Sequence, residues 1–120
     1  MAEHNALGHR GELIAQSFLK EKGYQILHVN WRFHRIEIDI IAMDGDTLVF
    51  VEVKTRQTDL FGEPENAVDY KKQKHLINAA NAYVLKHGVL NDARFDIISI
   101  VTEKNNTRIN HFPDAFYPTL

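Results

Sequence analysis

The chain has 120 residues, 44% of them hydrophobic and 25% charged, which predicts one domain spanning residues 1–120 and excludes a second full-sized one. Its 14 lysines and arginines against 16 aspartates and glutamates exclude a basic tail, so nucleic acid would have to bind at a local patch. The absence of cysteine excludes disulfides, thiolate zinc sites and cysteine nucleophiles. The lack of a long apolar run predicts a cytoplasmic protein without membrane contact.

The first predicted elements are a helix and a strand. From about His4 to Lys22 apolar residues recur at helical spacing, and Gly23 stands where the C-terminal glycine of a helix belongs. Residues Tyr24 to Phe33 alternate loosely between apolar and polar side chains, which indicates a strand. The side chains predicted on one side of this strand are Leu27, Val29, Trp31 and Phe33.

An antiparallel hairpin is predicted next. The segments Ile36–Ala42 and Thr47–Thr55 are rich in isoleucine and valine. Between them lies Asp44-Gly45, a dipeptide that favours a tight turn.

The second half of the chain predicts a loop, a helix and one or two strands. Arg56–Pro64 has the composition of a loop, and apolar residues from Val68 to His87 follow helical spacing. Arg94–Val101 is apolar enough on both faces to lie inside a sheet, and Thr107–Phe112 is expected to pair at an edge. The order αβββαβ with a short tail predicts an α/β fold, in which a mixed central sheet with strands three and four parallel is flanked by helices.

Acidic side chains interrupt both strands of the hairpin. Because strand side chains alternate between faces, Glu37 and Asp39 are predicted opposite to the isoleucines at 36, 38 and 40, and Glu52 shares a face with Lys54. A two-residue turn at Asp44-Gly45 would place Asp39 opposite Phe50 and diagonal to Glu52. A four-residue turn would place Asp39 directly opposite Glu52. In both registers the two carboxylates lie within a few ångströms of each other.

Two neighbouring carboxylates on apolar strands repel each other, so their burial is costly unless a cation neutralises them. Hard oxygen ligands, no cysteine and no paired histidines favour Mg²⁺ or Mn²⁺. Lys54 would point into the same site and hold a phosphate oxygen or a water molecule. The alternative is a purely structural ion pair between Lys54 and Glu52.

Each predicted helix offers one further charged candidate. Glu12 lies at the edge of the apolar face of the first helix. It is either a further metal ligand or a boundary residue whose carboxylate reaches solvent. Lys72 interrupts the inward face of the second helix. It is either a phosphate contact or a solvated lysine in the first turn. The seven histidines are scattered over different elements and are expected to be surface or packing residues.

From about Gly8 to Phe116 the chain resembles the YraN-type bacterial proteins. The segments that carry the resemblance are Gly11-Glu12-Leu-Ile-Ala15, Asn30-Trp31-Arg32, Glu37-Ile38-Asp39, Val49-Phe-Val-Glu-Val-Lys-Thr-Arg56, Phe61-Gly62-x-Pro64, the Lys72 helix and Arg94-Phe95-Asp96. The resemblance implies a restriction-endonuclease-like core related to archaeal Holliday-junction resolvases. It also implies that Asp39, Glu52 and Lys54 carry a nuclease signature and that Glu12 is the acid of the N-terminal helix.

The leading hypothesis is therefore metal-dependent hydrolysis of nucleic acid, with DNA as the expected substrate. Asp39 and Glu52 would bind Mg²⁺ or Mn²⁺ with the carbonyl of Val53 and with Glu12, and Lys54 would orient or activate the attacking water. The side chains expected to grip the phosphate backbone are Arg56, Lys72, Arg32 and Arg35. A homodimer acting across a branched substrate is a further hypothesis.

The alternative hypothesis is a binding module that keeps the nuclease core without turnover and holds nucleic acid or a protein. The weak net charge favours it, as does Ile36, which stands where the resembling proteins usually have glycine. Metal binding discriminates between the two hypotheses, because an inactive site would lack it.

Overall fold

A five-stranded sheet in the order β1-β2-β3-β4-β5 forms the centre of the computed structural model, which describes residues 6–57 and 68–117. The strands are β1 (Gln25–Phe33), β2 (Ile36–Asp44), β3 (Thr47–Arg56), β4 (Ala93–Glu103) and β5 (Asn106–Phe116). The helices are α1 (Ala6–Glu21) and α2 (Tyr70–His87). Strands β3 and β4 are parallel and the other neighbours are antiparallel, so the predicted mixed α/β sheet is confirmed.

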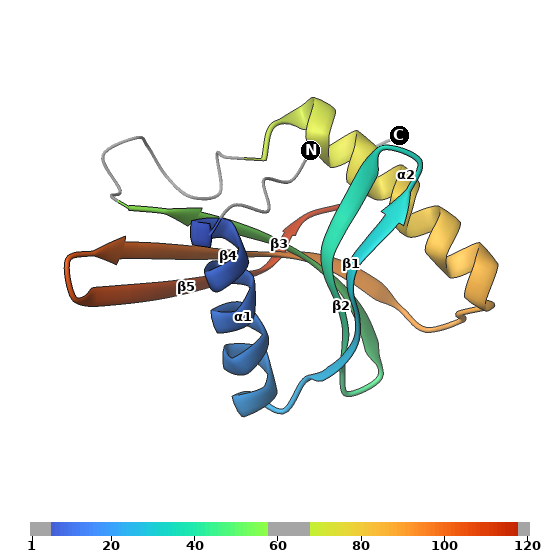
Figure 1. Cartoon of the computed structure of the whole chain (residues 1–120). Coiled ribbons are helices and arrows are strands. Elements are labelled where there is room, and N and C mark those ends of the chain that lie inside the picture. The colour runs from blue at the N-terminus through green and yellow to red at the C-terminus, as the bar shows by residue number, and fades with distance from the viewer. Residues whose placement is uncertain (1–5, 58–67, 118–120) are drawn as a thin grey trace.

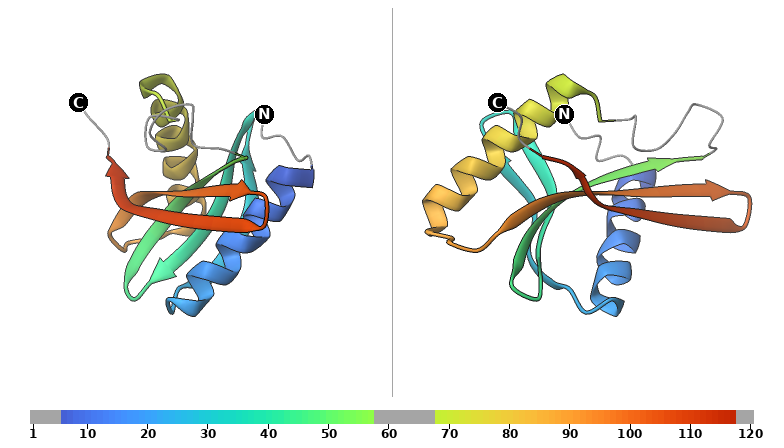
Figure 2. Two further views of the ribbon diagram at one scale, coloured as in Figure 1. Left: turned by 90° about the vertical axis from the view of Figure 1, so that its left-hand side faces the viewer. Right: turned by 180° about the vertical axis from the view of Figure 1, so that it is seen from behind.

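The two helices lie on opposite faces of the sheet, as Figures 1 and 2 show. Leu76, Ala79 and Tyr83 of α2 pack into one buried cluster, and Ala15 and Leu19 of α1 pack into the other. Strands in the middle of the sheet supply apolar residues to both clusters, which explains why β4 is apolar on both faces. Within the described part of the chain, neither helix is both long and apolar enough to span a membrane.

Helix ends follow the local capping signals. Gly23 adopts a φ of 95° just after α1, and its N–H donates to the carbonyl of Lys20 at 3.0 Å. The side chain of Asp69 caps α2 by accepting the N–H of Lys72 at 2.9 Å, and Gly88 ends that helix with a φ of 63°. The predicted start of α1 at His4 lies outside the described residues, as does most of the predicted loop Arg56–Pro64.

Strand β1 departs from its predicted alternation. Leu27 and Val29 are 37% and 42% exposed, whereas Trp31 and Phe33 pack against the α2-side cluster, so the prediction that these four side chains share one side is wrong. The register with β2 shifts between Ile26 and His28, and Asn30 has a φ of 53°. A bulge turns the following side chains to the other face, so a period of two cannot be carried along this edge strand.

The hairpin of β2 and β3 has a two-residue loop, Gly45 and Asp46, because Asp44 pairs with Thr47. The predicted hairpin is confirmed, but the register with the turn at Asp44-Gly45 is wrong. Met43 pairs with Leu48 and Ile40 with Val51, as in the other predicted register.

Alternation along β2 also breaks at Asp39. Ile36 and Ile38 pack with the α2-side cluster, whereas Ile40 packs with the α1-side cluster, so the prediction that these isoleucines share one face is wrong. The regular pairing of β2 with β3 ends at Ile40 and Val51. Past that pair the strands no longer follow a continuous ladder, and this is where the cavity described below opens.

A buried carboxylate ties β4 to β5 and to the end of β2. Asp96 has no exposed surface, accepts hydrogen bonds from Arg94 Nε at 3.0 Å and from the N–H of Asp114 at 2.9 Å, and lies 2.7 Å from Nε2 of His111. Nη1 of Arg94 also lies 3.0 Å from Oδ2 of Asp44. Burial alone would raise the pKa of Asp96, but its hydrogen-bonding partners outweigh burial and lower it.

Candidate active site

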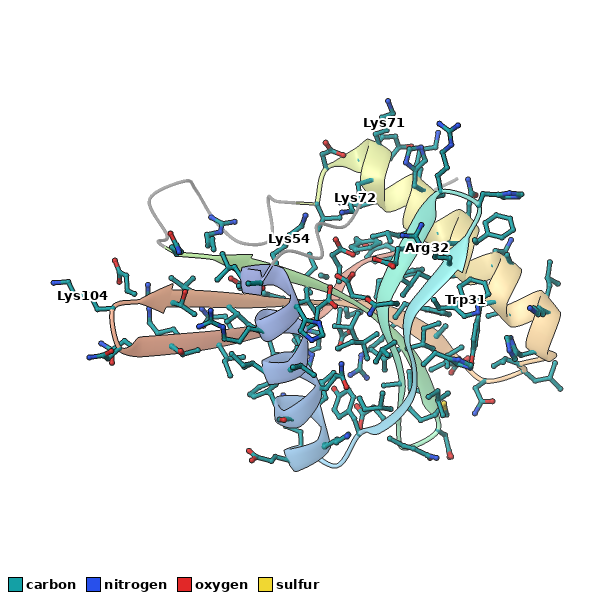
Figure 3. All side chains as sticks on the ribbon, viewed as in Figure 1. Trp31, Arg32, Lys54, Lys71, Lys72 and Lys104 are labelled. Carbon is teal, nitrogen blue, oxygen red and sulfur yellow. The ribbon has the colours of Figure 1, made fainter. Side chains whose placement is uncertain are left out.

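A cavity of about 530 Å³ opens between the N-terminal ends of the two helices, the start of β2 and the end of β3. The acidic side chains that line it include Glu12, Asp39 and Glu52. The basic ones are Arg32, Arg35, Lys54, Lys71 and Lys72. Figure 3 shows the labelled side chains of Lys54, Lys71, Lys72 and Arg32 at this end of the molecule. Acids from three elements therefore face the same space as a set of cations.

Asp39 and Glu52 are each 5% exposed. Oδ2 of Asp39 accepts the N–H of Val53 at 2.8 Å, beyond the last regular pair of the β2–β3 ladder. Burial, followed by the charges of Glu52 and Glu12, raises the pKa of Asp39 well above its usual range. Oε1 of Glu52 is buried and accepts no hydrogen bond from the described residues. This pair of carboxylates is costly to hold without a cation.

Two lysines converge on the other oxygen of Glu52. Lys72 Nζ lies 2.7 Å from Glu52 Oε2, and Lys54 Nζ lies 3.7 Å from the same atom. Burial lowers the pKa of Lys54, and the charge of Lys72 lowers it further against the opposing pull of Glu52. Burial alone would lower the pKa of Lys72 as well, but the charge and hydrogen bond of Glu52 outweigh it and raise that pKa. The two ammonium groups therefore differ in how readily they lose a proton.

Glu12 is 7% exposed, so it does not reach solvent as an ordinary boundary residue of α1 would. Its charge acts on Asp39 across the cavity. The neighbouring Gly11 lies against Thr55 of β3, and this close approach sets the distance between α1 and the cavity. The structure thus brings together Glu12, Asp39, Glu52 and Lys54, as the sequence predicts.

The predicted phosphate-binding residues divide into two groups. Arg32, Arg35 and Lys72 line the cavity, and Arg32 Nε lies 3.6 Å from Oε2 of Glu37. Arg56 is the last residue of β3 and is not part of the cavity lining.

Lys71 and His75 also line the cavity from α2, and neither is among the site residues predicted from the sequence. Their spacing of four residues, which puts both side chains on one side of a helix, was a signal that could have found them.

The donor atoms of the site fit a hard divalent cation. Within residues 6–57 and 68–117, no three histidine or acidic side chains are arranged as a complete metal-binding cluster. Mg²⁺, however, is usually held by one or two carboxylates together with waters and substrate phosphates. Asp39 and Glu52 supply two carboxylates, and the buried Oε1 of Glu52 has no described hydrogen-bond donor that a metal would have to replace.

The chain matches the uncharacterised protein family UPF0102 over residues 11–100. A UPF0102 protein of Bacteroides thetaiotaomicron is 49% identical over 120 residues, which cover 100% of this chain and 99% of the relative. UPF0102 proteins of Flavobacterium psychrophilum and Christiangramia forsetii are 48% and 46% identical over 117 residues, which cover 98% of both chains in each case. The similarity therefore extends over both helices and all the strands that form the cavity.

Proposed function

Since the chain belongs to the uncharacterised protein family UPF0102, its site chemistry is the best guide to its activity, and we propose that it is a divalent-metal-dependent nuclease. The observation that carries the proposal is the buried pair of Asp39 and Glu52 in a cavity with a cationic rim. Lys54 Nζ lies 3.7 Å from Oε2 of Glu52 in the same cavity. The expected substrate is DNA and the expected compartment is the cytoplasm.

The acidic residues would hold the metal ion. Asp39 and Glu52 provide two carboxylates, the carbonyl of Val53 is a third candidate oxygen, and Glu12 adds negative charge from α1. Mg²⁺ or Mn²⁺ bound there would supply an acidified water and would offset the charge that develops on the phosphate.

Lys54 is the residue proposed to orient or activate the attacking water. Burial lowers its pKa, so its ammonium gives up a proton more easily than that of a surface lysine. It lies on β3, two residues after Glu52, and lines the cavity.

The cationic rim would bind the phosphate backbone on either side of the scissile bond. Arg32 and Arg35 come from the β1–β2 end, while Lys71 and Lys72 come from the first turn of α2. Such contacts fix the position of the strand and carry no sequence information. We therefore expect little sequence preference.

We also infer that the core is restriction-endonuclease-like. The hairpin of β2 and β3 carries Asp39 and the Glu52-x-Lys54 motif, and β3 is followed by a helical crossover to the parallel strand β4. This arrangement supports the fold that the sequence resemblance implies.

The direct test is cleavage of labelled branched, duplex and single-stranded DNA, and of RNA, by the purified chain in Mg²⁺ or Mn²⁺. Lys54→Ala and Asp39→Asn should each reduce the rate by about a hundredfold or more, because each removes a group that acts in the transition state. Asp46→Asn, in the exposed loop of the same hairpin, serves as the matched control.

Equal cleavage by all three variants would refute the proposal. DNA retardation that survives Asp39→Asn, in a chain that binds no Mn²⁺, would identify the inactive binding module instead. Sedimentation of the same sample tests the homodimer hypothesis.

A further inference from the structure

Lys72 makes the shorter of the two lysine contacts with the buried carboxylate. Its Nζ lies 2.7 Å from Oε2 of Glu52, compared with 3.7 Å for Nζ of Lys54. Its backbone N–H is fixed by the cap residue Asp69, so the first turn of α2 holds the base of the side chain in place. The contact joins α2 to β3, and no local sequence pattern predicts it.

The two partners differ strongly in freedom to move. The side chain of Glu52 is 6% exposed and that of Lys72 is 41% exposed. A buried carboxylate on a central strand cannot leave the cavity, and the folded protein is destabilised when no cation neutralises that carboxylate. A lysine ammonium on a flexible four-carbon stem can swing toward a phosphate when another cation takes its place at Glu52. The ion pair is therefore fixed on the Glu52 side and releasable on the Lys72 side.

A second cation at Glu52 would conflict with the Lys72 ammonium. Both would be drawn to the same carboxylate, and like charges a few ångströms apart repel each other strongly in a partly buried site. Lys54 already adds one positive charge to this carboxylate. Binding of a divalent ion is thus favoured by any process that moves Lys72 away.

Resting on the proposed function, we propose that Lys72 is a tethered counter-ion that competes with the divalent metal for Glu52. Nucleic acid phosphate entering the cavity attracts the ammonium and releases Glu52 to the metal. Because linkage between two ligands is reciprocal, substrate and metal then bind cooperatively, and the chain holds its metal weakly until substrate arrives. Lys72 acts here as a positioning residue that controls the loading of the site.

The test is Mn²⁺ binding by the full chain without nucleic acid, followed by calorimetry and by the electron paramagnetic resonance of free Mn²⁺. Lys72→Met should bind Mn²⁺ about threefold to tenfold more tightly than wild type, since it removes a partly buried competing charge. Lys74→Met removes the same charge from an exposed position on the same helix and should change the affinity less than about twofold. Glu52→Gln should abolish binding.

A second measurement uses the unaltered chain. Excess Mn²⁺ should increase the rate at which acetic anhydride modifies Lys72 relative to Lys74, measured by mass spectrometry, because a displaced ammonium is more accessible. This readout applies even if Lys72→Met folds poorly.

The outcomes separate the two proposals. If Glu52→Gln abolishes Mn²⁺ binding but Lys72→Met binds no more tightly than wild type, and Mn²⁺ leaves the acetylation of Lys72 unchanged, the counter-ion role is overturned and the metal site stands. If neither wild type nor Lys72→Met binds Mn²⁺, the counter-ion role and the proposed nuclease function both fail.

Discussion

Gly11 of α1 and Thr55 of β3 approach so closely that a Cβ atom at position 11 would overlap Oγ1 of Thr55 and lie 3.0 Å from its Cβ. Rotating the threonine side chain cannot relieve the overlap fully, because its Cβ does not move with χ1. Only glycine permits this contact, and it holds the neighbouring Glu12 beside the carboxylates of the cavity.

Gly11→Ala should therefore destabilise the fold and shift Glu12. The overlap costs up to about 3 kcal/mol, which outweighs the gain of about 1 kcal/mol from better helix propensity. Urea denaturation measures the net loss in the free energy of unfolding. The double variant Gly11→Ala with Thr55→Ala should recover most of it, and a loss of equal size in the double variant would show that the contact is not the cause.

Asp39→Asn should stabilise the protein at neutral pH in the absence of divalent metal. The folded state raises the pKa of Asp39 above the ordinary value of 3.8 through burial and the charge of Glu52. A raised carboxyl pKa means that wild type loses stability as pH increases from about that ordinary value through the folded pKa, because the folded state binds the proton more tightly.

The amide cannot ionise, so the variant should gain about 1 kcal/mol over wild type at pH 8. The gain should disappear at pH below the ordinary aspartate pKa, where both forms are neutral. Thermal unfolding across this range measures the difference. A variant less stable than wild type at pH 8 would contradict the expectation.

Mg²⁺ or Mn²⁺ should raise the melting temperature of the wild-type chain. A ligand at a hundred times its dissociation constant stabilises the folded state by about 2.7 kcal/mol when it binds only that state. The double variant Asp39→Asn with Glu52→Gln should show no such shift in calorimetry. Asp46→Asn should keep the full shift, and an equal shift in the double variant would place the metal elsewhere.

Asp96→Asn should lower stability strongly, with a pH dependence opposite to that of Asp39. The folded state lowers the pKa of Asp96 because its hydrogen-bonding partners outweigh its burial. Its contribution is therefore present above the ordinary pKa of 3.8 and is lost as pH falls through the folded pKa.

Removing this charge leaves Arg94 partly unpaired, which typically costs about 3–5 kcal/mol for a buried pair. Urea denaturation at pH 7 and at pH 3 measures the difference, which should shrink at the lower pH. A variant as stable as wild type at pH 7 would show that the cluster contributes nothing to folding.

Much of the active-site arrangement follows from short-range rules. The hairpin around Gly45 is predictable from turn chemistry and from the isoleucine and valine content of its strands. Glu52 and Lys54 share a face because strand side chains alternate. Both candidate registers placed Asp39 near Glu52, so the error in the turn did not change which acids meet.

Alternation failed where the backbone is irregular. The register shift between Ile26 and His28 and the positive φ of Asn30 interrupt the alternation of β1, and Ile40 packs in the α1-side cluster although Ile38 packs in the other. These irregularities depend on how an edge strand fits its neighbour, which composition does not encode.

The sequence by itself determined the elements, the hairpin and the grouping of two acids with a lysine, because capping, turns and strand periodicity act between residues close along the chain. Only the tertiary structure decided that Glu12 is buried, that the β2–β3 ladder ends at the cavity and that Lys72 reaches Glu52. Those features depend on where two helices from distant parts of the chain dock on the sheet, and docking is set by the packing of whole faces.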